Sequence, residues 1–341
     1  MEEKRNKKIL HLCYSPFTGV GLHGGFRGNK WYKHRIDIFK KYTLQSFLNQ
    51  SNKNFVHWFS FRIDEKENPL TKELFNYLIS IKYPCIFTFD NLMYWDDKFT
   101  KYNLKTAFRN LLMMLWDCWI YKEFKSPGEL FVEMWENKNK TLLERLTHSL
   151  EKMKGIIIGW NKFKWVYLTR IDSDDMFHKD TIKLIKKQNP LESEALVFDK
   201  GYIYNTKTGQ LADWNPPTNP PFHTLIFPGE VFFNPIQHLK YYKDFKTHED
   251  IPRIFKCKTL DEKDYMVSFH GKHISTGWNS PLPRRIYQQM KYKPKGYCCT
   301  TSGKNTSTHW HSRTRHIKNF MIGKEYEGEK KQLILKDFGI N

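Results

Sequence analysis

The stretch WVYLTRIDSDD at residues 165–175 joins a hydrophobic run to three carboxylates, those of Asp172, Asp174 and Asp175. Residues 165–171 predict a buried β-strand. Carboxylates this close together repel one another, and a divalent cation beside them relieves the repulsion. Oxygen ligands of this kind suit Mn²⁺ or Mg²⁺, which also bind substrate phosphates. The stretch therefore predicts a metal site at the end of a strand. The alternative is a solvated turn in which one Asp caps the next helix.

Outward from this strand, short apolar runs alternate with helical patterns, which predicts an α/β fold with a mostly parallel central sheet flanked by helices. Ligands of such sheets bind beyond the carboxyl ends of the strands. Asn68-Pro69 is a helix start, with Asn68 as the N-cap, and the helix buries a stripe from Leu70 to Ile81. Expected strands lie at 9–14, 55–61, 85–89, 165–171, 195–199, 201–204 and 265–270. Expected helices lie near 36–48, 69–81, 104–119, 127–136, 142–154, 178–188 and 325–337.

Residues 195–199 and 201–204 are expected to form antiparallel strands, in a mixed second half of the fold. From about residue 281 the sequence is basic and poorly periodic. No internal repeat or strong boundary divides the chain, so residues 1–341 are expected to form a single domain.

The formal net charge of +20 favours an anionic partner, such as a nucleotide, a nucleic acid or an acidic membrane face. The alternative is that the lysines mainly provide solubility. Six cysteines without a CxxC pair predict reduced thiols in a cytoplasmic protein. No secretory segment is visible, and no run approaches the roughly 18 apolar residues of a spanning helix. A cytoplasmic location is expected, with peripheral contact at the inner membrane face as an open addition.

At residues 169–175 the chain resembles the GT-A glycosyltransferases, in which a DxD motif follows a central strand. It is most similar to a bacterial rhamnosyltransferase family. Three segments carry this likeness: RIDIF and TLQSF at 35–47 before NFxxW at 54–58, TRIDSDD at 169–175, and VSFHGKH at 267–273. The resemblance covers about residues 30–280. It implies a GT-A (Rossmann-like) domain with a nucleotide-binding half (about 1–176), an acceptor-binding half (about 177–280) and a basic extension (about 281–341).

The resemblance also implies roles for residues on the donor side. Asp174 matches the last Asp of DxD, which binds the metal that bridges the donor diphosphate. Asp172 matches the first, which turns toward the ribose or the water shell of the metal. Asp175 is a further ligand or a contact to the donor sugar. Asp64 lies at the position where this family reads the nucleobase.

Three other residues complete the donor-side predictions. Arg109 lies in a segment that resembles an ARN helix motif facing the donor, although Phe108 interrupts the motif here. Arg170 and Arg109 are candidates for binding the phosphates, because guanidinium groups pair well with them. His270 is a candidate for completing the metal shell, as a late His does in some GT-A enzymes. Its alternative is a structural role in the core.

Residues 248–250 resemble the ED signature on the acceptor side of inverting enzymes. Asp250, with Glu249, is therefore the candidate general base, since an acceptor hydroxyl must lose a proton as it attacks the sugar. The alternative is a helix cap or a pair with Arg253. The implied activity is metal-dependent transfer of a sugar, rhamnose by resemblance, with inversion. The donor is a nucleotide sugar such as dTDP-rhamnose, and the acceptor is a glycan, glycolipid or glycoprotein.

Three other functions stay open from the sequence. Residues Gly19–Gly24 form a GxGxxG match after a strand, which would suit a dinucleotide-dependent enzyme, but Gly25 and Gly28 delay the helix that should follow. The charge and the basic stretch 309–318 would suit a nucleic-acid-binding protein. No zinc-finger, RNP or helix-turn-helix signature supports this, so no nucleic acid is expected as a partner. Trp214 with the loop 215–221 would suit a non-catalytic sugar- or lipid-binding protein.

Overall fold

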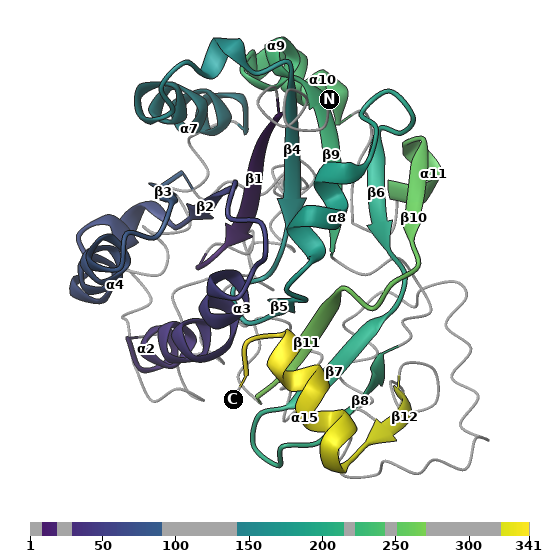
Figure 1. Cartoon of the computed structure of the whole chain (residues 1–341). Coiled ribbons are helices and arrows are strands. Elements are labelled where there is room, and N and C mark those ends of the chain that lie inside the picture. Colours follow the sequence, from purple (N-terminus) through teal and green to yellow (C-terminus); the bar gives the residue numbers. More distant parts are fainter. Residues whose placement is uncertain are drawn as a thin grey trace, which may run out of the picture.

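The computed structural model describes residues 9–18, 29–90, 142–214, 222–242, 251–270 and 322–340. At its centre is a seven-stranded sheet in the order β10-β6-β9-β4-β1-β2-β3 (Figure 1). All neighbouring strands are parallel except β9, which runs antiparallel to both β4 and β6. These strands are β1 (Ile9–Pro16), β2 (Val56–Ser60), β3 (Cys85–Thr88), β4 (Trp165–Arg170), β6 (Ala195–Phe198), β9 (His223–Pro228) and β10 (Cys257–Leu260). The predicted α/β fold with helices flanking a sheet is confirmed.

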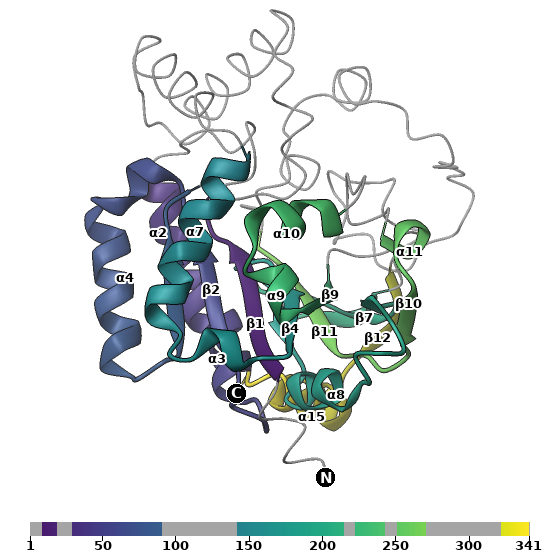
Figure 2. The ribbon, with the colours of Figure 1, turned by 90° about the horizontal axis from the view of Figure 1, so that it is seen from above.

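The central strand β1 is buried along its whole length, because helices cover both faces of the sheet. Its side chains alternate between two hydrophobic clusters, with Ile9 and Cys13 in one and Leu10 and Leu12 in the other. The first face is covered by α2 (Asn29–Ile38), α3 (Leu44–Leu48), α4 (Pro69–Ser80) and α8 (Thr181–Lys187). The second is covered by α7 (Leu142–Ile156), α9 (Gly229–Phe232), α10 (Pro235–Tyr241) and α11 (Ile251–Ile254). Figure 2 shows α8 and α7 on opposite sides of the strands.

Helix α4 begins as its sequence predicts. The side chain of Asn68 accepts a hydrogen bond of 2.9 Å from the backbone N–H of Leu70. Leu74 and Leu78 are fully buried, whereas Ile81 is exposed. The expected stripe was wrong at Ile81, because the helix ends at Ser80.

A second sheet of five strands, in the order β12-β8-β7-β11-β5, lies beside the first (Figure 1). Its strands are β5 (Met176–Phe177), β7 (Gly201–Asn205), β8 (Leu211–Trp214), β11 (Tyr265–Phe269) and β12 (Ile322–Tyr326). Gly201 permits close packing of β7 on β11, since a Cβ there would lie 2.5 Å from the Tyr265 ring. The antiparallel strands expected at 195–199 and 201–204 are confirmed, and they lie in different sheets. β6 pairs with β9, and β7 pairs with β8, because the chain changes sheets between β6 and β7.

At the end of the chain, the helix expected near 325–337 is confirmed as α15 (Gly328–Asp337), but it is not part of a separate extension. β12 pairs with β8, and α15 packs on the five-stranded sheet. Phe338 is fully buried against Tyr202, with ring centroids 5.8 Å apart. Residues 322–340 therefore belong to the folded body. The expected helices at 104–119 and 127–136 lie outside the described residues, whereas the helix expected at 142–154 is α7.

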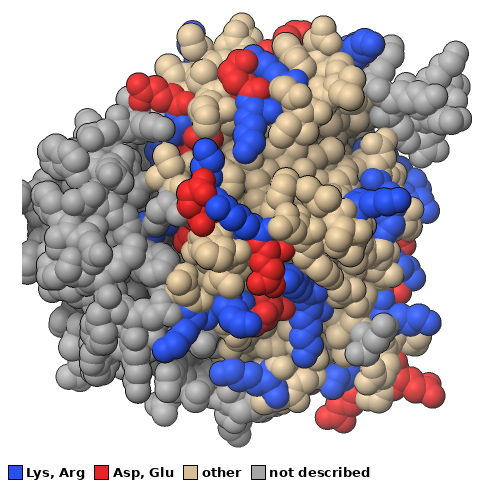
Figure 3. All heavy atoms as spheres, turned by 90° about the vertical axis from the view of Figure 1, so that its left-hand side faces the viewer, with Lys and Arg blue, Asp and Glu red and all other residues tan. Residues whose placement is uncertain are grey.

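Over the side of the molecule shown in Figure 3, Lys and Arg side chains are interspersed with Asp and Glu side chains. Among the described residues, no helix combines the length and the apolar character that crossing a bilayer requires.

Candidate functional site

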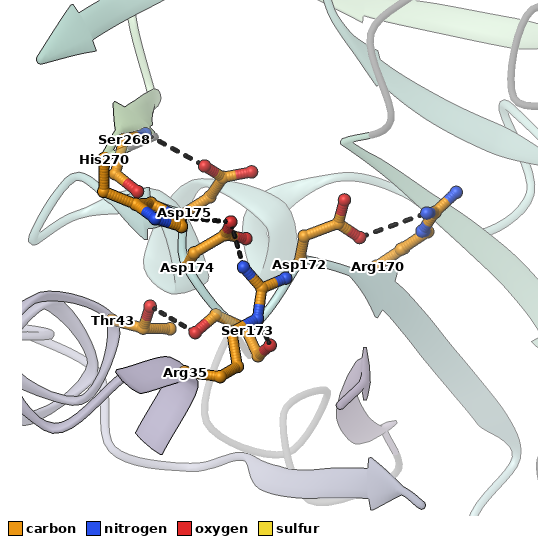
Figure 4. Close-up of polar contacts among 9 residues, drawn as sticks. All are labelled: Arg35, Thr43, Arg170, Asp172, Ser173, Asp174, Asp175, Ser268 and His270. Carbon is orange, nitrogen blue, oxygen red and sulfur yellow. Dashed lines mark hydrogen bonds and ion pairs between the residues drawn. The ribbon is translucent and has the colours of Figure 1, made fainter. Parts of the chain in front are cut away.

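The acidic cluster Asp172–Asp175 lies where β4 leaves the seven-stranded sheet and β5 enters the second one (Figure 4). Two hydrogen bonds to the adjacent strand β1 fix the backbone at the point where the chain leaves β4. The backbone N–H of Ile171 donates to the carbonyl of Tyr14 at 3.0 Å, and the Ser15 hydroxyl donates to the carbonyl of Ile171 at 2.8 Å. The cluster therefore occupies the carboxyl edge of the central strands, which is the edge where ligands of such sheets bind.

Asp174 is held by two groups from distant elements. A guanidinium nitrogen of Arg35, on α2, forms an ion pair with Asp174 Oδ2, and Nε2 of His270 lies 2.9 Å from the same oxygen. Arg35 also donates from Nε to the Ser173 hydroxyl at 2.9 Å. The Arg35 and Asp174 side chains are only 2% and 6% exposed. This is a buried ion pair, and its members depend on each other because neither charge reaches much water.

Asp175 is the second buried carboxyl of the cluster. Its Oδ1 accepts a 3.0 Å hydrogen bond from the backbone N–H of Ser268, on β11. Burial raises the pKa of Asp175 well above its ordinary value, and the charges of Asp174 and Asp172 raise it further, against the opposing effects of the Ser268 N–H and Arg35. A positive charge brought to this cluster would favour the ionised form of Asp175.

Asp172 is the member of the cluster that solvent reaches most easily, with its side chain 31% exposed. Its Oδ1 lies 3.1 Å from Nη2 of Arg170, the last residue of β4. Its carbonyl accepts a hydrogen bond of 3.1 Å from the Asp175 N–H, which closes the turn. A ligand arriving from solvent would therefore meet Asp172 before the buried carboxyls.

The structure brings together five of the residues proposed from the sequence, namely Arg170, Asp172, Asp174, Asp175 and His270 (Figure 4). The alternative of a solvated turn is wrong, because Asp174 and Asp175 are buried.

Other sequence-predicted residues are not placed in this group. The backbone of Asp64 lies in a short 3-10 helix (Ile63–Lys66) after β2, and its side chain is not described. Arg109, Glu249 and Asp250 lie outside the described residues, as do Gly19–Gly24. Their roles stay predictions.

Sequence reasoning did not assign a role to Arg35, the residue with the closest contact to Asp174. The sequence nevertheless contains a signal that Arg35 is buried. Arg35 lies four residues after Trp31 and four before Phe39, so helical periodicity places it on the same face as these two buried aromatic residues. A cation on an otherwise apolar helix face needs a buried partner, and the acidic cluster is the obvious candidate.

The cluster has the ligand types that Mn²⁺ or Mg²⁺ prefers, with three carboxylates on one turn and an imidazole beside them. In the described part of the chain, however, no three His, Cys, Asp or Glu side chains are arranged around a common point that could hold an ion. Arg35 supplies the positive charge beside Asp174. The donor set therefore fits a divalent ion by chemistry, and an ion bound to Asp174 Oδ2 would compete with Arg35 for it.

Fold and site define an α/β protein with a mixed, helix-flanked sheet and a buried acidic cluster at its carboxyl edge. No protein-family model matches the chain, and no curated protein is similar to it. The relation to the GT-A glycosyltransferases stays a prediction from the motifs.

Proposed function

We propose that this protein is a metal-dependent glycosyltransferase of the GT-A type, which uses a nucleotide-sugar donor. The observation that carries the proposal is the cluster Asp172–Asp175 at the end of β4, in which Asp174 and Asp175 are buried and two guanidinium groups contact the carboxylates. Buried carboxyls crowded together cost stability, and such groups are concentrated at functional sites.

In this proposal, Asp172 and Asp174 would hold Mn²⁺ or Mg²⁺, which would stabilise the charge that develops on the departing nucleoside diphosphate. Arg170 is suited to a phosphate oxygen, because its guanidinium group contacts Asp172, the most accessible carboxylate of the cluster. His270 orients the Asp174 carboxylate through the contact at 2.9 Å. Asp64 and Arg109 are proposed to contact the nucleobase and the phosphates.

On the acceptor side, Asp250 is proposed as the base that removes the proton of the attacking hydroxyl, assisted by Glu249, with inversion at the sugar. The proposed sugar is rhamnose, carried by thymidine diphosphate, and the acceptor is a glycan, a glycolipid or a glycoprotein. These choices rest on the motif resemblance. A cytoplasmic location is proposed on the same basis as before, from the cysteine usage.

A donor screen tests the proposal. Nucleotide sugars are incubated with the protein, with and without Mn²⁺ or Mg²⁺, and release of nucleoside diphosphate is measured. We expect metal-dependent release from one donor class. Asp174→Asn should reduce it by at least about 100-fold, because removal of one electrostatic stabiliser typically has this effect. Asn is chosen over Ala because it retains the shape beside Arg35.

Asp213→Asn is the matched control, since Asp213 is a partly buried carboxylate on β8, away from the cluster. It should leave release unchanged. Full activity in Asp174→Asn, or metal-independent release in the native chain, would remove the basis for the metal role. Binding of NAD(P) in place of any nucleotide sugar would instead favour the dinucleotide alternative.

A further inference from the structure

The turn between α7 and β4, residues 156–164, carries apolar side chains into solvent at the amino edge of the seven-stranded sheet. Ile158 is 97% exposed and Ile156 is 49% exposed, whereas Ile157 between them is buried in the core. Single exposed apolar residues are common on protein surfaces. Here two isoleucines two positions apart are exposed, one of them almost wholly.

The turn holds these side chains outward by its own packing. The Ile157 N–H donates to the carbonyl of Met153 at 2.8 Å, and the Trp160 N–H donates to the carbonyl of Ile157 at 3.2 Å. Gly159 has a φ of 68°, a left-handed conformation that favours glycine. The Trp160 ring packs on Phe233, with centroids 4.9 Å apart. The isoleucines are therefore presented on an anchored turn.

Lysines lie close to the two isoleucines in the sequence. Lys162 and Lys164 are exposed, and Lys154 lies 5.1 Å above the Trp160 ring while it binds Glu151. The ammonium group of Lys152 lies instead 5.2 Å from the ring of Phe89, the residue that follows β3. Glu151 is the only carboxylate in residues 151–164. The exposed Glu230 on α9 is near, because the Gly229 N–H donates to the carbonyl of Lys164. Three lysines (Lys154, Lys162 and Lys164) against two carboxylates (Glu151 and Glu230) leave a small positive excess on the turn.

The turn lies at the end of the sheet opposite the acidic cluster. Ile9, the first residue of β1, pairs with Trp165, the first residue of β4, so the turn precedes the amino ends of these parallel strands. Figure 1 shows the turn at the upper end of β4, whereas the acidic cluster follows its lower end. The surface is therefore separate from the proposed transferase site.

We propose that this turn is a docking surface for an anionic lipid bilayer, with Ile156 and Ile158 inserted at the boundary of headgroups and acyl chains. Trp160 and the lysines would lie at the level of the headgroups. Exposed isoleucines followed in the chain by exposed lysines suit a deformable, negatively charged surface. It suits a protein partner less well, because stable protein interfaces bury about 800 Å² on each side, with apolar residues at their centre.

Vesicle co-sedimentation of the full chain tests this surface. Vesicles of phosphatidylcholine alone are compared with vesicles that also contain phosphatidylglycerol. We expect binding to the anionic vesicles that weakens as salt is raised. Ile156→Asn with Ile158→Asn should lower the partition coefficient by about tenfold or more, because the inserted apolar area is lost. Lys162→Glu with Lys164→Glu should lower it by a similar factor.

Leu333→Asn is the matched control, since Leu333 is 64% exposed but lies on α15, on the other sheet. It should bind as the native chain does. All variants should have the same melting temperature as the native chain, because they change exposed side chains. The proposal is overturned if the native chain does not sediment with anionic vesicles, or if the double isoleucine variant binds as well as the native chain. A self-association that the isoleucines control, without vesicle binding, would identify a protein interface instead. None of these outcomes depends on transferase activity.

Discussion

The two sheets of the molecule contain acidic side chains in very different surroundings. At the carboxyl edge of the seven-stranded sheet, Asp174 and Asp175 are buried next to each other. On the five-stranded sheet, Asp213 has its own partners, with Nζ of Lys263 at 2.5 Å and the Tyr326 hydroxyl at 2.8 Å. Paired charges near the surface are ordinary structural features, whereas crowded buried carboxyls raise one another's pKa and need a further positive charge. The difference favours the first region as the functional one.

The largest effect expected from this difference concerns Arg35. Arg35→Gln should lower the free energy of unfolding by about 3–5 kcal/mol, because it leaves the Asp174 carboxylate buried without its ion-pair partner. Urea denaturation of the variant and the native chain measures the change.

Two further measurements sharpen the test of Arg35. Arg35→Gln combined with Asp174→Asn should recover much of the lost stability, because the double variant buries no charge at this position. If the cluster takes a divalent ion, Mn²⁺ should raise the melting temperature of Arg35→Gln more than that of the native chain. A loss below about 1 kcal/mol in the single variant would contradict the buried-pair interpretation.

The second effect concerns Asp264, a buried carboxyl next to Lys263 whose Oδ2 accepts no hydrogen bond from the described residues. Burial raises the pKa of Asp264 to about 7, and the charges of Glu262 and Asp180 contribute. The folded chain therefore binds a proton that the unfolded chain releases above about pH 4. Stability should fall as pH rises from about 4 to about 7, by up to about 4 kcal/mol from this group, and then level off.

Asp264→Asn removes this contribution. Urea denaturation at several pH values should show a shallower decline in the variant than in the native chain. Asp175, whose pKa is also raised, adds a slope of the same sign to both proteins, so the difference between them isolates Asp264. If the free energies of unfolding of the variant and the native chain change with pH in parallel, the pKa of Asp264 is not raised by its burial. The five-stranded sheet would then lose its example of a buried carboxyl with a raised pKa.

The same two regions show what the sequence can and cannot predict. Strand β4, its acidic end and the Asn68 cap follow from residues within a few positions of one another. The partners of Asp174 cannot be predicted from neighbouring residues, because Arg35 and His270 are 139 and 96 residues away in the sequence. The pairing of β12 with β8 likewise joins segments more than a hundred residues apart. Local periodicity says which face of an element is buried but not against what.

The smallest effect is expected on the five-stranded sheet, where Lys263→Met removes the cation beside Asp213. The Asp213 carboxylate keeps its hydrogen bond from the Tyr326 hydroxyl and remains partly open to water. The loss in the free energy of unfolding should therefore be about 1 kcal/mol or less, which is typical of a partly exposed ion pair. Urea denaturation measures it, and the release of nucleoside diphosphate should not change. If Lys263→Met lowered the free energy of unfolding as much as Arg35→Gln does, the ion pairs of both sheets would be equally important for stability. The crowded carboxylates at Asp172–Asp175 would then no longer distinguish a functional site from a structural one.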